Sequence, residues 1–189
     1  MDFLIYSRGS TVVAESDDPA ALNEQHWSYM DRFADRMTAR GPTLGPDRES
    51  WTGSLHVVDL SGPEAARRFV AEEPYQRAGR FAEHSIWRFD NLLGRTMWQF
   101  PGAADEPRFL VLARGVGTPV AVADLASELR DALVLYGALR DLDDGPTGVA
   151  LAVQASSREA LDVLLSDPRT GLADRGAVDV HDWEFGGRR

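Results

Sequence analysis

The side chains able to exchange a proton near neutral pH are four histidines, His26, His56, His84 and His181. The 189-residue chain has no cysteine, and all 20 of its basic residues are arginines because it has no lysine. These absences exclude a thiolate nucleophile, a lysine Schiff base, and zinc–cysteine or iron–sulfur sites. What remains is general acid–base chemistry, in which carboxylates, tyrosines and arginines support a histidine.

His26 interrupts an apolar helical pattern made by Leu22, Met30, Phe33 and Met37. Residues at this spacing share one helix face, so we expect the imidazole to be partly buried between a helix and a sheet. A buried imidazole needs a polar partner. The pattern leaves open whether that partner is a substrate or a backbone carbonyl that satisfies a structural histidine.

Glu73 lies directly before Pro74-Tyr75, where an α-helix cannot continue. We therefore expect a fixed turn to aim its carboxylate. The alternative is a solvated surface carboxylate, which is what we expect of its neighbour Glu72. Contact with His26 would favour a role in chemistry.

Strand alternation suggests further substrate contacts. On the predicted strand from Thr52 to Leu60, Ser54 and His56 point to one face. On the last strand of the first half, His84 and Arg88 likewise share a face, although either histidine can instead cap a sheet edge. With two tyrosines added, the candidate substrate-binding residues are Tyr6, Ser54, His56, Tyr75, His84 and Arg88.

The motifs of metal and nucleotide sites are missing from the sequence. The histidines and Glu73 show no His-x-His, His-x-x-x-His or carboxylate-triad spacing, so we expect no metal site. Gly115-Val116-Gly117 has no third glycine at the position that a dinucleotide fingerprint requires. We expect no cofactor and a small-molecule substrate.

The chain is acidic, with 30 acidic residues against 20 basic ones and a formal net charge of -10. This charge repels a phosphate backbone, and the sequence has no basic patch, so we expect no nucleic-acid partner. Charged residues interrupt every apolar stretch within a few positions, and no leader-like segment opens the chain. We expect no membrane contact and a cytoplasmic location.

The two halves of the chain repeat the same features in the same order. Each half begins with an apolar strand, followed by a helical pattern, a strand, a second helix, an acid–proline pair and a closing strand. The paired features are Phe3 to Gly9 with Phe109 to Gly115, Leu22 to Met37 with Leu125 to Tyr136, Thr52 to Leu60 with Thr147 to Gln154, Glu73-Pro74 with Asp167-Pro168, and Trp87-Arg88-Phe89 with Trp183-Glu184-Phe185.

This order predicts an α+β fold made of two fused ferredoxin-like βαββαβ units. We place the units at residues 1–100 and 108–189, with a Pro-, Gly- and acid-rich linker at 101–107 and a short strand at 96–100 just before it. Each antiparallel sheet would carry helices on one face only. The two apolar faces would then pack together as an intramolecular dimeric α+β barrel, giving a monomer with an internal pseudo-dimer or a weak homodimer.

The first half, from Met1 to Phe100, resembles the YCII-related domain family. The residues that carry the resemblance are His26, Gly41-Pro42, Gly53-Ser54, Pro74-Tyr75, Gly79 and His84, in this order along the chain. The resemblance implies the dimeric α+β barrel fold, similar to muconolactone isomerase. It also implies an active site built from a histidine and the acid before the Pro-Tyr pair, which are His26 and Glu73 here. Glu73 stands where the family usually has aspartate.

The second half matches the family more faintly. Asp167-Pro168-Arg169 keeps the acid and loses the tyrosine, and leucines such as Leu129 and Leu133 stand where the helix would carry a histidine. We therefore expect one working pocket, in the first half, and a degenerate second half that completes the barrel.

Two function classes follow from these residues. The first is a small-molecule enzyme of the lyase, isomerase, dehydratase or dehydrohalogenase type, with His26 as general acid or base and Glu73 as its partner, acting on a cyclic or aromatic metabolite, as in specialised metabolism. The second is a non-catalytic ligand-binding or regulatory protein, in which His26 anchors a ligand in the barrel. A structural or interaction role is the third alternative.

Overall fold

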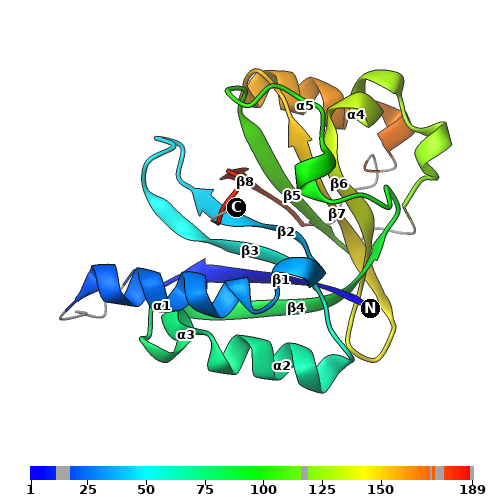
Figure 1. Ribbon diagram of the computed structural model, residues 1–189. Helices are drawn as coiled ribbons and strands as arrows, with labels where there is room; N and C mark the ends of the chain where they lie inside the picture. Colours follow the sequence, from blue (N-terminus) through cyan, green and yellow to red (C-terminus); the bar gives the residue numbers. More distant parts are fainter. Residues whose placement is uncertain (12–17, 116–118, 171, 173–176, 188–189) are drawn as a thin grey trace.

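The strands in the computed structural model all pair antiparallel and close into a barrel in the order β1-β3-β2-β8-β5-β7-β6-β4, with β4 returning to β1 (Figure 1). The structure describes residues 1–11, 18–115, 119–170, 172 and 177–187. The strands in these residues are β1 (Asp2–Gly9), β2 (Met37–Leu44), β3 (Trp51–Asp59), β4 (Phe81–Asn91), β5 (Arg108–Arg114), β6 (Leu133–Arg140), β7 (Pro146–Gln154) and β8 (Val178–Trp183).

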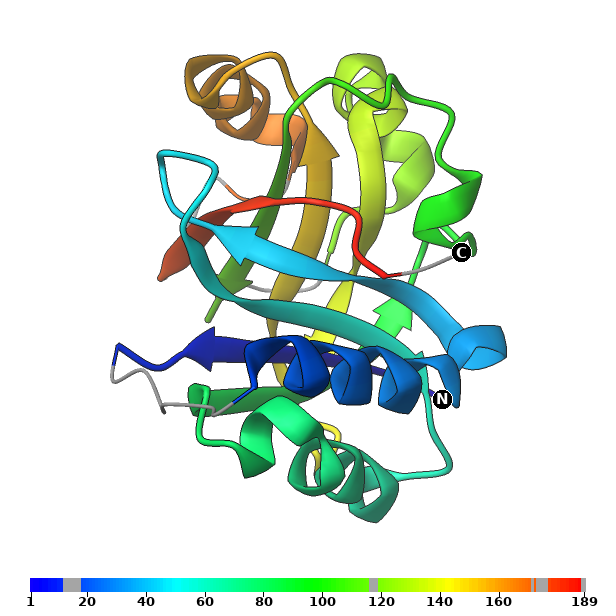
Figure 2. The ribbon, with the colours of Figure 1, turned by 60° about the vertical axis from the view of Figure 1, so that its left-hand side comes forward.

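The helices lie outside the barrel and cover the two ends of the molecule seen in Figures 1 and 2. They are α1 (Pro19–Asp31), α2 (Pro63–Glu72), α3 (Pro74–Arg77), α4 (Ser127–Ala132) and α5 (Arg158–Ser166), with short 3-10 turns at Ala34–Arg36, Met97–Gln99, Val122–Asp124 and Pro168–Thr170. The predicted α+β fold with an antiparallel sheet is confirmed.

Each half of the chain contributes four neighbouring strands, in the order β4-β1-β3-β2 and β8-β5-β7-β6. Two seams join them. In one seam β2 pairs with β8 at Thr43–Trp183 and at Leu44–Asp182; in the other β4 pairs with β6 from Arg88–Arg140 to Asn91–Gly137. The last strand of each half therefore pairs with the second strand of the other half.

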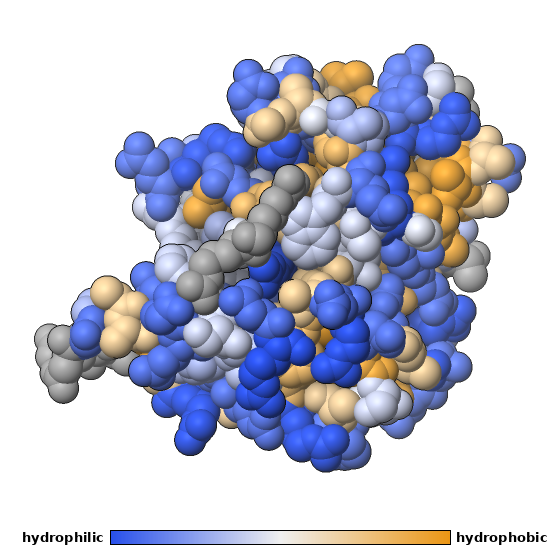
Figure 3. Space-filling view, viewed as in Figure 1, coloured by the Kyte–Doolittle hydropathy of each residue, from blue (hydrophilic) through white to orange (hydrophobic). Residues whose placement is uncertain are grey.

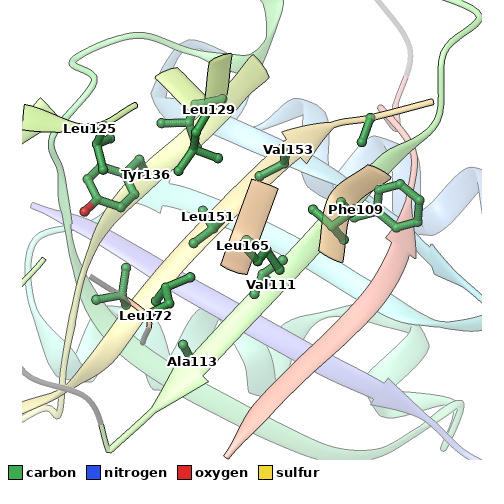
Figure 4. Packing of buried hydrophobic residues seen from close by; sticks show 14 of the residues in the cluster. Phe109, Val111, Ala113, Leu125, Leu129, Tyr136, Leu151, Val153, Leu165 and Leu172 are labelled. Carbon is green, nitrogen blue, oxygen red and sulfur yellow. The ribbon is translucent and has the colours of Figure 1, made fainter. Parts of the chain in front are cut away.

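Alternation along the strands divides the apolar residues into three layers. Leu4, Leu55 and Leu110 point into the barrel, where Trp183 joins them. On the outer face of the first half, residues such as Phe3 pack against α1 and α2. On the outer face of the second half, the side chains of β5 and β7 pack with Leu129 of α4 and Leu165 of α5 (Figure 4).

The strand register shows which positions of the two halves are equivalent. Arg8 of β1 pairs with Gly53 of β3, as Arg114 of β5 pairs with Gly148 of β7. The matched Trp-x-Phe endings are out of register by two residues, because Phe89 and Trp183 hold equivalent places in the two seams. Both side chains point into the barrel core, so the burial of a large ring is what the two positions share.

The second strand of each half lies where the sequence predicted helix. Residue Met37 begins β2, and Leu133 and Tyr136 belong to β6, so α4 ends earlier than the spacing indicated. A continuous apolar run suits a buried strand as well as a helix, and β2 carries glycine and proline, which disguise a strand. The predicted short strand at 96–100 is instead a 3-10 turn closed by reciprocal hydrogen bonds of Thr96 and Gln99.

The surface in the view of Figure 3 is mainly hydrophilic, with hydrophobic residues gathered in a few areas. Within the described residues, no helix combines the length and the hydropathy needed to cross a bilayer.

Candidate functional site

His26 of α1 and Glu73 form a hydrogen bond of 2.6 Å between Nδ1 and Oε1. Both side chains are shielded from solvent, at 12% exposure for His26 and 4% for Glu73. A carboxylate only accepts hydrogen bonds, so Nδ1 carries the proton and donates it. In the neutral imidazole, the opposite ring nitrogen, Nε2, then has no proton and can take one from a substrate.

The turn before Pro74 fixes the Glu73 carboxylate. Glu73 ends α2 and caps the N-terminus of α3, where its Oε2 accepts a hydrogen bond of 2.7 Å from the backbone N–H of Gln76. Proline at the first position of α3 forces Glu73 into an extended conformation and stops α2 there. Each carboxylate oxygen therefore has its own donor, and the one bonded to His26 cannot rotate away without losing the cap.

Tyr75 holds the His26 ring from the side. Their planes lie 3° from parallel, with centroids 4.1 Å apart. The Tyr75 hydroxyl donates to Oδ1 of Asn23 at 2.6 Å, and the Arg80 guanidinium lies 4.4 Å from the Tyr75 ring centroid. Because Tyr75 is anchored at both its ring and its hydroxyl, the orientation of the imidazole is set before any ligand arrives.

A pocket of about 200 Å³ opens beside the dyad and is called the dyad pocket below. It combines aromatic walls with a few polar side chains, which is the usual composition of a small-molecule site. Its lining residues are His26, Trp27, Met30, Arg40, Gly41, Pro42, Trp51, Ser54, His56, Tyr75, Gly186 and Gly187.

The second half of the chain closes one wall of the dyad pocket. Beyond β8, the backbone N–H of Gly186 donates to the carbonyl of Arg40 at 2.9 Å, and the segment runs beside β2 (Figure 2). A Cβ added to Gly41 would lie 1.8 Å from the carbonyl oxygen of Glu184, and one added to Gly187 would strike the Arg40 guanidinium. Glycines therefore allow this segment to lie flat on β2.

His56 of β3 is 4% exposed and lines the dyad pocket, with its ring centroid 6.1 Å from that of His26. Burial lowers the pKa of His56 well below its usual value, and the neighbouring His26, Arg40 and His84 lower it further. His56 is therefore neutral at pH 7 and can serve only as a neutral donor or acceptor.

Acid should destabilise the protein through His56. A histidine whose pKa is lowered in the folded state binds a proton more readily in the unfolded chain, so stability falls as the pH drops below the usual value of 6.5. For this fully buried group we expect a loss of about 1 kcal/mol of unfolding free energy per pH unit between pH 6.5 and about pH 5. Urea unfolding measured across this range tests the expectation. In His56→Leu the slope should flatten, and an unchanged slope would contradict it.

His84 is connected to the dyad through Gln76. Its Nε2 lies 2.6 Å from Oε1 of Gln76, and its Nδ1 lies 2.8 Å from the hydroxyl of Ser7. Burial lowers the pKa of His84, which keeps it neutral, so Nε2 donates to Gln76 and Nδ1 accepts from Ser7. Gln76 in turn donates its backbone N–H to Glu73. The structure thus places His84 outside the dyad pocket, as a residue that positions Gln76.

Tyr6 and Arg88, also predicted as substrate contacts, lie elsewhere. Tyr6 points into the barrel, where its ring centroid is 4.7 Å from that of His181. Arg88 forms an ion pair of 2.9 Å with Asp144, in the turn between β6 and β7. Ser54, His56 and Tyr75 do line the pocket with His26, so the structure brings together three of the six predicted contacts.

Arg40 and the C-terminal glycines are site residues that the sequence did not reveal. Arg40 is 5% exposed and lies 3.9 Å from Asp31, with which it forms an ion pair. Its signal is alternation within β2, which the sequence pattern hides because helical spacing extends to Met37 and no strand is predicted over residues 37–44. The contact of Gly186 with β2 joins residues far apart in the sequence, for which no local pattern exists.

The equivalent region of the second half is filled with apolar side chains. By strand register, Val149, Leu151 and Tyr136 take the places of Ser54, His56 and Arg40. All three belong to the outer core of that half, and Figure 4 shows Leu151 and Tyr136 within it. Asp167 follows α5 at the helix end, as Glu73 follows α2. Leu129 of α4, however, belongs to the same apolar cluster as Val149, Leu151 and Tyr136. Among the residues that the structure describes, only those of the first half therefore present a polar pocket at this place.

A metal is not suggested by the arrangement, since the described residues contain no group of three histidine or carboxylate side chains close enough to hold one.

Three solved structures show what this chain resembles. The 5-chloro-2-hydroxyhydroquinone dehydrochlorinase TftG from Burkholderia phenoliruptrix is 26% identical over 48% of this chain and 94% of its own, with a TM-score of 0.37. A "putative monooxygenase" from Lactobacillus acidophilus is 11% identical over 98% of this chain and 96% of its own, with a TM-score of 0.54. A "putative chlorite dismutase" is 12% identical over 96% and 94%, with a TM-score of 0.56.

At these identities, the two full-length matches concern the fold alone. The search of curated proteins gave no match. The family model of the YCII-related domain matches residues 1–90. That stretch contains the His26–Glu73 dyad and every residue of its pocket except two C-terminal glycines.

Proposed function

We propose that the protein is a small-molecule enzyme that moves a proton at an activated carbon, with His26 as general base and acid. The observation that carries this proposal is the 2.6 Å contact between His26 and Glu73 at the edge of an open pocket. A structural histidine would need only a backbone carbonyl as partner. Here a buried carboxylate is held by a helix cap for this one contact, which is how a base is oriented and its charged form stabilised.

The proposed reaction begins with a substrate C–H bond next to a carbonyl or on an activated ring. Nε2 of His26 takes the proton, and the electron pair of the C–H bond moves onto the substrate oxygen. Glu73 stabilises the imidazolium that forms. The electron pair then returns in one of two ways. It can accept a proton from His26 at another carbon, which is isomerisation. It can instead expel a leaving group, which departs as halide ion or as hydroxide that takes the proton from His26 and leaves as water; this is elimination.

Arg40 is the group placed to stabilise the negative substrate oxygen. It lines the same pocket as His26, and its side chain is buried, which strengthens its attraction for an anion. Neutral His56 and the hydroxyl of Ser54 add hydrogen-bonding groups on the floor formed by β3. Trp51 and Tyr75 supply flat apolar walls that suit a cyclic or aromatic substrate. The second half, in this proposal a fused and degenerate ferredoxin-like unit, contributes only the glycine wall.

A substrate panel in D₂O tests the proposal directly. Small cyclic ketones, lactones and substituted phenols are incubated with the protein, proton NMR follows deuterium entering the substrate, and mass spectrometry follows loss of water or halide. Deuterium incorporation or elimination that requires His26 supports the enzyme. Saturable binding without any exchange or elimination in the whole panel would instead support a ligand-binding protein.

Glu73→Gln should reduce the rate of any reaction found by about 10- to 100-fold, because the base remains but loses its charged partner. Glutamine keeps the side-chain length and can still accept from the Gln76 N–H, so folding should be retained. Glu72→Gln is the matched control, since Glu72 is the exposed neighbour on the same helix. Equal rates for Glu73→Gln and Glu72→Gln would remove Glu73 from the mechanism.

A further inference from the structure

A second pocket, of about 290 Å³, lies at one end of the barrel interior and is separate from the dyad pocket. We call it the barrel-mouth pocket. No residue is shared between the two, because the dyad pocket lies on the outer, helix-covered face of the sheet and this one on the inner face. It is lined by Tyr6, Arg8, Glu83, Ser85, Trp87, Leu112, Arg114, Asp179 and His181.

Both halves of the chain build the barrel-mouth pocket from equivalent strand positions. By strand register, Arg8 and Arg114 hold equivalent places in the two halves, and so do Trp87 and His181. Tyr6 likewise corresponds to Leu112, and Ser85 to Asp179, so every lining residue except Glu83 belongs to such a pair. The residue types differ within three of these pairs. The pocket is therefore not symmetric between the two halves, and a ligand would bind it in one orientation.

The charged residues of the pocket are already neutralised. Arg8 pairs with Glu83 at 3.2 Å, and Arg114 pairs with Asp179 at 2.6 Å. A charged ligand would have to compete with one of these pairs, because it would be attracted by one member of the pair and repelled by the other. The charge balance therefore favours a ligand without net charge.

The remaining polar groups are neutral hydrogen-bonding groups. The Tyr6 hydroxyl lies 3.4 Å from Nδ1 of His181, at the long end of a hydrogen bond. Burial raises the pKa of Tyr6 and lowers that of His181, so neither is charged near pH 7. Such a weak contact can be exchanged for a stronger bond from the Tyr6 hydroxyl to an acceptor on a ligand.

Trp87 and Leu112 provide the apolar surface against which a ring can pack. The geometry points to a second ligand site in the barrel mouth, which binds a small uncharged aromatic molecule carrying a carbonyl or hydroxyl group. This site does not depend on the proposed reaction at His26. It gives the chain a means to bind a ligand between its two halves while the dyad pocket is occupied.

A matched series of probes tests the site on the full chain. Benzamide, benzoate and benzylamine have similar shapes and are neutral, anionic and cationic near pH 7. Each is titrated into uniformly ¹⁵N-labelled protein while the backbone amide signals are followed. We expect benzamide to bind most tightly and to shift the amides of Ser85, Leu112 and Asp179. Tighter binding of benzoate or benzylamine, shifts confined to the surroundings of His26, or no shifts at millimolar concentration would each overturn the assignment.

Tyr6→Phe keeps the ring and removes only the hydroxyl, so the barrel should fold as before. We expect it to weaken benzamide binding by about tenfold, the effect of losing one hydrogen bond. Ser54→Ala, which removes a hydroxyl from the dyad pocket, is the matched control and should leave this affinity unchanged. If Tyr6→Phe leaves the affinity unchanged, or if Ser54→Ala weakens it as much, benzamide does not bind through Tyr6 and the proposal fails.

Discussion

His26→Ala is expected to lower the rate of the proposed proton transfer by about 10²- to 10⁴-fold, the usual contribution of a positioned general base. The loss should appear mainly in kcat, because Arg40 and the aromatic walls that bind the substrate remain in place. The measurement is steady-state kinetics on whichever substrate of the D₂O panel reacts. It is paired with circular dichroism, which shows whether the barrel is intact.

Added imidazole separates a catalytic His26 from a structural one. Alanine leaves a space at the edge of an open pocket, next to the unchanged Glu73, where free imidazole can bind in the place of the lost ring. We expect imidazole to restore part of the activity of His26→Ala and to have no effect on the wild type. Restoration should rise with pH through the pKa of imidazole, since the neutral form is the base. Activity that is lost without any restoration, in a variant with a perturbed circular dichroism spectrum, would favour the structural role.

The dyad could be found from the sequence because its signals are local. His26 is polar at an apolar helix position, and Glu73 precedes a proline that must end a helix. Neither signal alone brings the two side chains together; the resemblance of the first half to the YCII-related domain supplied the pairing. The fold class followed for a similar reason, since the apolar strands β1 and β5 repeat each other almost residue for residue.

The rest of the site depends on contacts between residues that are distant in the chain. Strand β2 is stabilised by β3 on one side and by β8 on the other, so residues such as Gly41-Pro42 can lie in a strand despite their low intrinsic preference for it. The position of Tyr6, by contrast, follows from alternation along β1. Its neighbour Ser7 points toward His84, so Tyr6 must point to the opposite face of the sheet, inside the barrel.

Gly41→Ala is expected to lower the free energy of unfolding by about 2–4 kcal/mol, a larger loss of stability than His26→Ala or Glu73→Gln should cause. The added Cβ would lie 1.8 Å from the carbonyl oxygen of Glu184, so the C-terminal segment has to leave β2. The hydrogen bonds that Glu184 and Gly186 donate to β2 would be lost with it. Urea unfolding measures the effect on stability. Because the same segment forms a wall of the dyad pocket, KM for the substrate should also rise.

Gly137→Ala distinguishes a specific effect on the wall of the dyad pocket from a general loss of barrel stability. Gly137 is the equivalent position in the other half, and a Cβ there would lie 2.1 Å from the carbonyl oxygen of Asp90, in the seam between β4 and β6. The two variants should therefore lose comparable stability, yet only Gly41→Ala disturbs the dyad pocket. If both raise KM equally, the pocket responds to general loosening of the barrel. If only Gly41→Ala raises it, the second half of the chain acts on the first through the few residues that follow β8, and this contact is what the second half adds to the site.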